Sequence, residues 1–497
     1  MAYSTEAFLP ATRDELLSRG WDRPDIILVT GDAYIDSPLV GTAVIGRVLE
    51  HAGYRVAVIP QPATDSEKDI TRLGEPKLFW GVTSGCVDSL VSNYTALKKR
   101  RRRDDYTAGG LNNRRPDRSL IVYTNLIRRY FKNTVPIVLG GIEAGTRRIA
   151  HYDFWSDSVR RSVLFDAKAD ILVYGMGEKA VLEIAQRRKA GLSLDDLPGT
   201  CSISRENRHG YAEIPSYESV VKDRDAFSRM FKLFTEAAEK DESFVQLHGD
   251  RYLLHHRPAP FLRQEELDAL HALPYRLEAH PIHQKEGPVR ALETIRFSLV
   301  SHRGCYGGCS FCSISVHQGS RIISRSESSI VEEGRAFTRH PRFKGIISDV
   351  GGPTANMYMT GCSLPVPCSR AQCLFPQPCP KLNTDHSPQL RLLENLRQLP
   401  GVRHVFIASG LRHDLVLADP KHEEYINALV RHHVSGQCKT APEHVQKSIL
   451  KVMRKPLPES LLTFKNLFDR FSQDAGKKQF LTYYFIAAHP GCTLQDM

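Results

Sequence analysis

The sequence contains no apolar run that approaches the roughly 20 residues needed to span a bilayer, and its mean hydropathy is −0.32. The N-terminal text MAYSTEAFLPATRDELL lacks the basic and apolar regions of a secretory signal peptide. These absences predict a cytoplasmic protein with no membrane partner. Because reducing compartments disfavour disulfides, the 11 cysteines are expected to be thiols or metal ligands.

Internal repeats and long low-complexity tracts are also absent from the sequence. The 497 residues include 41% apolar and 25% charged residues, which is ordinary for a globular protein. A chain of this length can form two to four domains, each with its own core.

The first large region, residues 25–195, alternates short apolar runs with helical periods, which predicts an α/β fold. We expect a doubly wound parallel sheet, with helices on both faces. Its strands are expected near 26–30, 56–59, 78–82, 120–123, 136–139 and 171–174. Glycine and aspartate follow several of these strands, at the edge where such sheets bind ligands.

A second β/α series begins near Thr294 and contains five expected strands, each ending in a polar or glycine-rich loop. This pattern predicts a βα-barrel with its active site at the carboxyl ends of the strands. The chain stops just after the fifth strand, so we expect a partial barrel or a truncated sequence. The predicted organisation is an N-terminal arm (1–24), the first α/β domain (25–195), a connector (196–290) and the partial barrel (291–497).

The text RGCYGGCSFCSI directly follows the first barrel strand and spaces its cysteines as Cys305-x3-Cys309-x2-Cys312. Three thiolates on one loop can ligate three irons of a four-iron four-sulfur cluster and leave the fourth iron open. The alternatives are a zinc site or three cysteines spaced by chance. The position after a strand and the neighbouring glycines favour the cluster.

This motif resembles the radical S-adenosylmethionine (SAM) superfamily. The resemblance implies that an electron from the cluster cleaves SAM to a 5′-deoxyadenosyl radical, which acts on an unidentified substrate. It also implies that Phe311 lies near the SAM adenine. Gly351 and Gly352 match the Gly-Gly of the motif that binds the SAM amino group, although Pro353 replaces its acidic residue. A tight turn would also require these glycines. The catalytic residues stay unassigned.

Other loops of the barrel supply candidates from position alone. They are Ser409, Arg412, Lys439, Glu443, His444 and the HPG text at 489–491, which resembles methylthiotransferase-like radical SAM enzymes. Over nearly its whole length the chain is similar to the YgiQ family. This similarity is carried by the cysteine motif together with the segments GDAYIDSPLVGTAVIGRVLE, GGIEAGTRRIAHYDFWSDSVRRSVL, LHGDRY, ISDVGGPTANMYM and APEH. That family has no established reaction, and its members usually run beyond this chain's end.

A second group of cysteines lies in the proline-rich loop after the second barrel strand. Cys362, Cys368, Cys373 and Cys379 fall within 18 residues. Four thiolates can hold zinc or an auxiliary iron–sulfur cluster, and free or redox-active thiols are the alternative. We expect the four sulfurs to lie within reach of a shared metal.

The N-terminal sheet resembles the cobalamin-binding domain found upstream of many radical SAM barrels, on GGIEA (140–144) and ADILVYGMGEKAVLEIA (169–185). The loop after the first strand, GDAYIDSP, lacks the histidine that often ligates cobalt. We therefore expect a domain that has kept this fold without binding cobalamin.

The net charge of +11 and the basic run at 98–103 suggest either a solvated loop or a footprint for RNA. The leading hypothesis is an enzyme that modifies RNA, protein or another substrate, and that needs a reductant such as flavodoxin or ferredoxin. The alternative is a non-catalytic iron–sulfur or zinc protein that acts as a scaffold or redox sensor.

Overall fold

The computed structural model describes residues 8–362 and 372–497 and divides the chain into two compact units. Unit 1 is formed by the residues up to Phe261 together with Leu273–Arg296, and unit 2 by Leu262–Ala272 together with the residues from Phe297 onward. No helix in the described part of the chain is long and apolar enough to cross a membrane.

Unit 1 is built around a nine-stranded sheet, counted over the described residues, in the order β10-β11-β12-β9-β8-β5-β4-β1-β3. Its strands are β1 Ile26–Thr30, β3 Val56–Pro60, β4 Phe79–Thr83, β5 Ile137–Gly140, β8 Ile171–Val173, β9 Thr200–Ser204, β10 Ala212–Ile214, β11 Phe244–His248 and β12 Arg251–His255. The five strands from β3 to β8 are parallel, whereas β9 and β12 add antiparallel pairs. The predicted α/β class and its large parallel sheet are confirmed.

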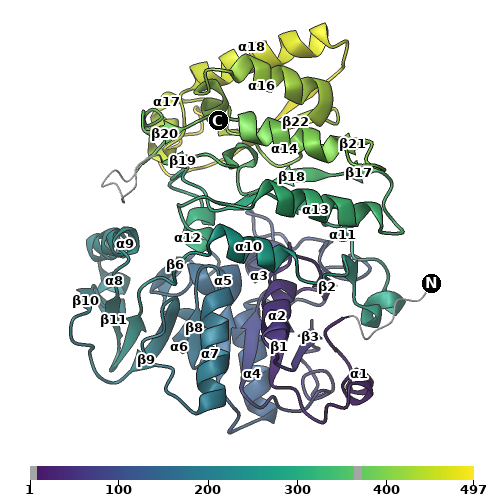
Figure 1. The fold of residues 1–497 in the computed structure, drawn as a ribbon. Coiled ribbons are helices and arrows are strands. Elements are labelled where there is room, and N and C mark those ends of the chain that lie inside the picture. The colour runs from purple at the N-terminus through teal and green to yellow at the C-terminus, as the bar shows by residue number, and fades with distance from the viewer. Residues whose placement is uncertain (1–7, 363–371) are drawn as a thin grey trace. The chain divides into compact units, whose positions relative to one another are not determined.

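Helices cover both faces of this sheet (Figure 1). Alternate residues of β1 belong to two different hydrophobic cores. Ile27 and Val29 pack in one core with α4 (Ser119–Tyr130) and α6 (Val163–Ala167), and Ile26 and Leu28 pack in the other with α2 (Gly41–His51) and α7 (Glu178–Ala190). Strands buried on both faces read as continuous apolar runs, which explains the sequence pattern. The helices of unit 1 are α1 Arg13–Ser18, α2 Gly41–His51, α3 Ser89–Asn93, α4 Ser119–Tyr130, α5 Gly141–Thr146, α6 Val163–Ala167, α7 Glu178–Ala190, α8 Tyr217–Lys222, α9 Arg224–Glu239, α11 Leu292–Ile295 and the 3₁₀ helix η2 Pro281–Glu286.

Two short ribbons complete unit 1. β2 (Ile35–Asp36) pairs with β13 (Glu278–Ala279), and β6 (His151–Asp153) forms a hairpin with β7 (Ser158–Arg160). Both are antiparallel.

One prediction for unit 1 was wrong. The strand expected at 120–123 is the start of helix α4, in which Leu120, Tyr123, Thr124 and Ile127 recur at helical spacing on the buried face. The range 196–290, expected to be a connector, contains β9 to β12, which extend the sheet. β9 pairs antiparallel with β8 and β12, β12 pairs antiparallel with β11, and β10 pairs parallel with β11. Unlike the parallel strands, these segments are not continuous apolar runs, as the buried Gln246 in β11 shows, so the sequence pattern does not indicate them. The proposed domain boundaries themselves stay predictions.

Unit 2 consists of short strands separated by helices. Its strands are β14 Ser298–Val300, β15 His302–Arg303, β16 Ile323–Ser324, β17 Ile346–Ile347, β18 Asp349–Gly351, β19 Gly361–Cys362, β20 Leu382–Asn383, β21 His404–Val405, β22 Gln437–Glu443 and β23 Phe480–Phe485. Its helices are α10 Gln264–His271, α12 Ile314–Gln318, α13 Glu327–Thr338, α14 Ser387–Arg397, α15 His413–Leu417, α16 His422–Ala428, α17 Lys447–Met453, α18 Pro458–Asp474, the 3₁₀ helix η3 Ala355–Met357 and the π-helix η4 Leu429–His433.

Consecutive strands of the second series pair in parallel. β14 pairs with β18, β17 with β21, and β22 with β23. A parallel bridge between Leu411 and Thr440 joins the third and fourth members of the series. This order brings the loops that follow the strands to one end of unit 2.

Candidate functional site

The loop that carries Cys305, Cys309 and Cys312 lies between β15 and α12. It turns away from β15 at Gly304, whose φ is +85° and at which a Cβ would stand 1.9 Å from the Arg321 carbonyl oxygen. Its far side is anchored on α17, because the Ser310 amide donates to the Met453 carbonyl (3.2 Å) and the Ser310 hydroxyl to the Val452 carbonyl (2.8 Å). Glycine is therefore required to start the loop, and backbone contacts hold it.

Two of the three cysteine sulfurs surround Gly307. A Cβ at Gly307 would lie 3.2 Å from the Cys305 sulfur and 3.8 Å from the Cys309 sulfur, so the missing side chain leaves a cradle. The Cys312 amide donates to the Cys309 carbonyl (3.2 Å), which closes the loop on itself. Burial raises the pKa of the Cys312 thiol, and the neighbouring Cys309 and Cys305 add to this effect.

Among the described residues, no three His, Cys, Asp or Glu side chains are grouped as a single metal ion would require. A cubane spaces its thiolates more widely than one ion does, because each sulfur ligates a different iron. The kind of metal group that this loop holds, a cluster or a zinc ion, stays a prediction. The convergence of all three sulfurs stays a prediction.

Arg412 places a cation beside these sulfurs. Its Nη1 lies 3.6 Å from the Cys309 sulfur, while Nε and Nη2 donate to the two oxygens of Asp414 at 2.9 and 2.7 Å. Burial alone would lower the pKa of Arg412, but the Asp414 carboxylate outweighs it and raises the pKa. A permanent cation is thus held beside the thiols by a two-pronged ion pair.

Lys455 is a second buried cation near the cysteines and is only 4% exposed. Burial, followed by the charge of Arg412, lowers its pKa, whereas Cys309 acts in the opposite direction. Its Nζ lies 3.9 Å from the carboxylate of Glu443, and burial raises the pKa of Glu443. Glu443 has a φ of +70°, an unusual conformation for a non-glycine residue.

Gly351 and Gly352 end the second strand of the series. A Cβ at Gly351 would lie 2.3 Å from the Ser409 hydroxyl oxygen, and one at Gly352 would lie 2.6 Å from the His302 ring. The Gly351 carbonyl accepts from both the amide (2.7 Å) and the hydroxyl (3.1 Å) of Ser301. Close packing therefore accounts for both glycines, and their contact with SAM stays a prediction.

Phe311 precedes the third cysteine and is 36% exposed. Its ring meets the ring of His489 edge-on, with centroids 6.3 Å apart. The HPG turn after the fifth strand is thereby brought to the cysteine loop. The role of Phe311 at the adenine stays a prediction.

Sequence positions alone identified some members of this site and missed others. Arg412 and Glu443 were expected. Lys455 and Asp414 were missed, since Lys455 lies beyond α17 and Asp414 lies in the first turn of α15. The only available signal for Asp414 was its place two residues after Arg412.

Two further candidates have partners of their own, and a third is half-buried in a strand. Ser409 donates its amide (3.0 Å) to Asp349, and the two side chains also bond. His444 accepts from the Gln446 amide (2.9 Å) and lies 3.6 Å from the Cys492 sulfur. Lys439 is half-buried in β22.

The second cysteine group is only partly described, because Cys368 lies outside the described residues. The Cys379 amide donates to the Cys373 carbonyl (2.8 Å), and both cysteines pack against a hydrophobic cluster that includes Leu374 and Leu382. Cys362 is exposed in β19. The shared metal stays a prediction.

In unit 1, the crevice at the carboxyl ends of β1 and β4 is where a sheet of this strand order would hold a ligand. The buried Arg115 occupies it: its guanidinium reaches Asp32 at 2.7 Å and Asp104 at 3.0 Å, and it also donates to the Ser84 carbonyl. A Cβ at Gly31 would lie 2.2 Å from the Ser84 oxygen, so β1 and β4 approach closely here. Paired charges of the chain itself therefore lie at this end of the sheet.

Comparison with known families supports the class suggested by the fold and the cysteine loop. A family profile described as "Radical SAM N-terminal" matches residues 8–298, so the chain carries the N-terminal domain of a radical SAM protein. More specifically, the chain belongs to the UPF0313 family, which is the YgiQ family that its sequence resembles.

A UPF0313 protein of Fusobacterium nucleatum is 46% identical over 99% of this chain and 88% of the relative. One of Thermotoga maritima is 48% identical over 97% of this chain and 86% of the relative. Another, of Methanocella arvoryzae, is 47% identical over 98% of this chain and 82% of the relative.

Two solved structures share the fold at low sequence identity. The radical SAM methyltransferase TsrM of Kitasatospora setae, with tryptophan and a SAM analogue bound, has a TM-score of 0.51 at 15% identity, over 92% of this chain and 66% of its own. TsrM is also known with cobalamin and a [4Fe-4S] cluster. The cobalamin-dependent enzyme OxsB, with aqua-cobalamin bound, has a TM-score of 0.52 at 13% identity, over 95% of this chain and 50% of the OxsB chain.

Proposed function

We propose that this protein is a radical SAM enzyme that cleaves SAM reductively and directs the resulting radical to an unidentified substrate. The observation that carries the proposal is the cysteine loop, in which the Cys305 and Cys309 sulfurs flank the Gly307 cradle beside Arg412. Cys305, Cys309 and Cys312 would hold the [4Fe-4S] cluster. RNA and protein are the substrate classes we favour, and flavodoxin or ferredoxin would supply the electron.

The arrangement of unit 2 supports a partial βα-barrel in this enzyme. The parallel pairs from β14 to β23 have the order of consecutive barrel strands, and the cysteine loop follows the first of them. The five parallel strands of unit 1 likewise support a doubly wound domain before the barrel.

Each nearby side chain has a physical role in this proposal. When bound, the cluster supplies the electron that breaks a carbon–sulfur bond of SAM. Arg412 and Lys455 offset the negative charge of the thiolates. Asp414 keeps Arg412 in place through two hydrogen bonds. Phe311 and His489 offer flat surfaces that suit the SAM adenine.

We also propose that unit 1 binds no cobalamin in its sheet crevice, unlike the cobalamin-bound TsrM and OxsB. The support is the buried Asp32–Arg115–Asp104 arrangement, because a ligand there would have to displace paired charges. Equilibrium dialysis against aquocobalamin tests this. No retention is expected, and one cobalamin retained per chain would contradict the proposal.

The decisive test of the main proposal is anaerobic reconstitution with iron and sulfide, followed by SAM and dithionite. The enzyme is expected to release 5′-deoxyadenosine, whereas Cys305→Ala is expected to release none. A protein that takes up iron and sulfide but yields no 5′-deoxyadenosine would instead be the scaffold or redox sensor.

A further inference from the structure

The basic run of unit 1 lies on an exposed loop and is not neutralised by carboxylates. All six side chains from Lys98 to Arg103 are exposed. Their side-chain hydrogen bonds go to uncharged groups, such as the Trp155 carbonyl for Lys98 and the Val91 carbonyl for Arg101. Arg102 and Arg103 form no ion pair with any residue that the structure describes. The loop therefore presents concentrated positive charge to solvent.

Aromatic rings are interleaved with these cations. Tyr94 and Trp155 pack with centroids 4.2 Å apart. The Arg100 guanidinium lies 5.6 Å from the Tyr94 ring, and the Lys98 ammonium lies 5.0 Å from the ring of Phe154, which is 57% exposed. Cations and rings thus form one continuous surface.

We propose that this basic–aromatic surface, made of Tyr94, Lys98, Lys99, Arg100, Arg101, Arg102, Arg103, Phe154 and Trp155, binds single-stranded nucleic acid. Backbone phosphates would meet the cations and unpaired bases would stack on the rings, which is the common design of sequence-tolerant single-strand binding. The surface concerns binding alone, so it is independent of the cluster chemistry.

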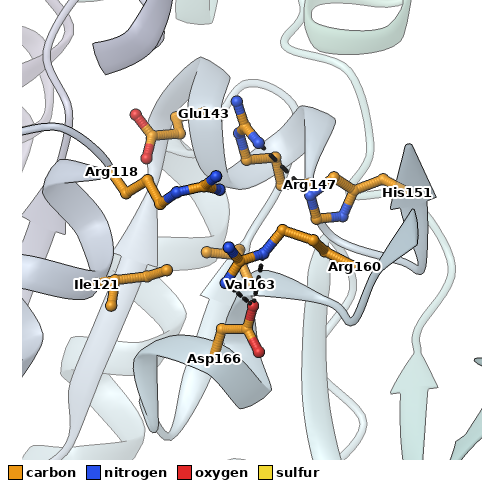
Figure 2. A pocket seen from close by; sticks show the side chains of 8 residues that line it. All are labelled: Arg118, Ile121, Glu143, Arg147, His151, Arg160, Val163 and Asp166. Carbon is orange, nitrogen blue, oxygen red and sulfur yellow. Dashed lines mark hydrogen bonds and ion pairs between the residues drawn. The ribbon is translucent and has the colours of Figure 1, made fainter. Parts of the chain in front are cut away.

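The turn that carries Phe154 and Trp155 is held in place before any ligand arrives. It joins β6 to β7, and its Asp153 carboxylate accepts from Arg118 (2.7 Å), Arg147 (3.1 Å) and the Ser156 amide (3.0 Å). Figure 2 shows the side chains of Arg118, Arg147 and Arg160 turned into one small pocket beside this hairpin. Arg118 and Arg147 hold the turn through Asp153, and Arg160 is paired with Asp166, whereas the cations of the loop are exposed.

A single strand fits this surface better than a duplex or a membrane does. A duplex stacks its bases internally, so aromatic side chains reach only the unpaired bases of loops and single strands. Membrane-surface binding uses the apolar face of an amphipathic helix, whereas residues 94–103 form turns and isolated bridges. The exposed Phe154 ring beside cations that no carboxylate neutralises therefore favours a single strand.

Fluorescence anisotropy of the full chain tests the proposal with four probes. They are a 16-nucleotide single-stranded RNA, the same sequence as single-stranded DNA, the RNA duplex, and phosphatidylserine vesicles. The single strands are expected to bind more tightly than the duplex, and the RNA and DNA arms identify the preferred backbone. Tighter duplex binding, or binding to the vesicles alone, would overturn the proposal.

Two matched pairs of variants locate the surface. Arg102→Gln with Arg103→Gln is expected to reduce the salt slope of log K by about 1.4, from about 0.7 for each lost phosphate contact. Arg224→Gln with Arg229→Gln makes the same charge change on exposed positions of α9 and is expected to leave the slope unchanged. Equal effects of the two double variants would refute a localised surface.

The second pair tests the stacking. Phe154→Ala is expected to weaken binding about 5- to 150-fold, the range that corresponds to one lost base stack. Phe231→Ala removes a ring of similar exposure (55% against 57%) on α9 and is expected to have no effect. Wild-type affinity in Phe154→Ala would contradict the stacking role.

Discussion

Replacing Gly307 by alanine tests whether the space between the cysteine sulfurs is needed. The added Cβ would stand 2.9 Å from Nη1 of Arg412, 3.2 Å from the Cys305 sulfur and 3.8 Å from the Cys309 sulfur. Arg412 cannot easily retreat, because Asp414 holds it at 2.9 and 2.7 Å. Overpacking of this kind costs about 1–3 kcal/mol, which corresponds to about 5- to 150-fold in cluster affinity.

Gly410→Ala is the matched control in the same unit. Neither glycine has a left-handed φ, but a Cβ at Gly410 would meet no atom within 4 Å. The assay is iron and sulfide content per chain after anaerobic reconstitution over a range of iron concentrations. Gly307→Ala is expected to require more iron for half-loading, while Gly410→Ala matches the wild type. Equal loading curves for all three proteins would refute the reasoning.

Three further predictions concern charge, pH and the second cysteine group. Lys455→Met removes a buried cation and is expected to lower the reduction potential of the reconstituted cluster by about 60 mV or more, equivalent to a tenfold shift in the equilibrium. Lys451→Met, at an exposed position, is the control, and equal potentials of the two variants in a redox titration would contradict the role of Lys455. Burial lowers the pKa of His302 to about 4 from 6.5, so the folded protein favours the neutral imidazole. The free energy of unfolding should therefore fall by about 3 kcal/mol as the pH drops from 6.5 to 4. His302→Gln should flatten this profile in urea unfolding, and an unchanged profile would show that His302 is not the cause. Metal analysis of the Cys305→Ala, Cys309→Ala, Cys312→Ala triple variant should find residual iron with sulfide; one zinc instead would indicate a structural site, and neither metal would mean that the second group holds none.

The sequence predicts the parallel strands of unit 1 well, because strands buried on both faces are continuous apolar runs. It misled at Leu120, where four apolar residues in a row resemble such a strand, although Tyr123 and Ile127 continue a helical face. The sequence pattern also gave no sign of β11 and β12. These two strands are neighbours in the chain and pair with each other, but β12 joins the sheet by pairing with β9, which lies much earlier in the chain.

The candidate site likewise contains residues that the order of the chain predicts and residues that only tertiary packing brings in. The cysteines and Arg412 follow strands of the series directly, so their position could be inferred from order along the chain. Lys455 joins them only through tertiary packing, since it follows α17 and carries no local signature. The Arg115 ion pairs in unit 1 were also beyond prediction, because they connect residues 32, 104 and 115 across separate loops.

The most direct test of the central claim is electron paramagnetic resonance of the dithionite-reduced, reconstituted protein with and without SAM. A reduced [4Fe-4S] signal is expected whose g values change when SAM is added, because three cysteine ligands leave one iron open to it. A signal that is absent, or that SAM leaves unchanged, would contradict a SAM-binding cluster at Cys305, Cys309 and Cys312.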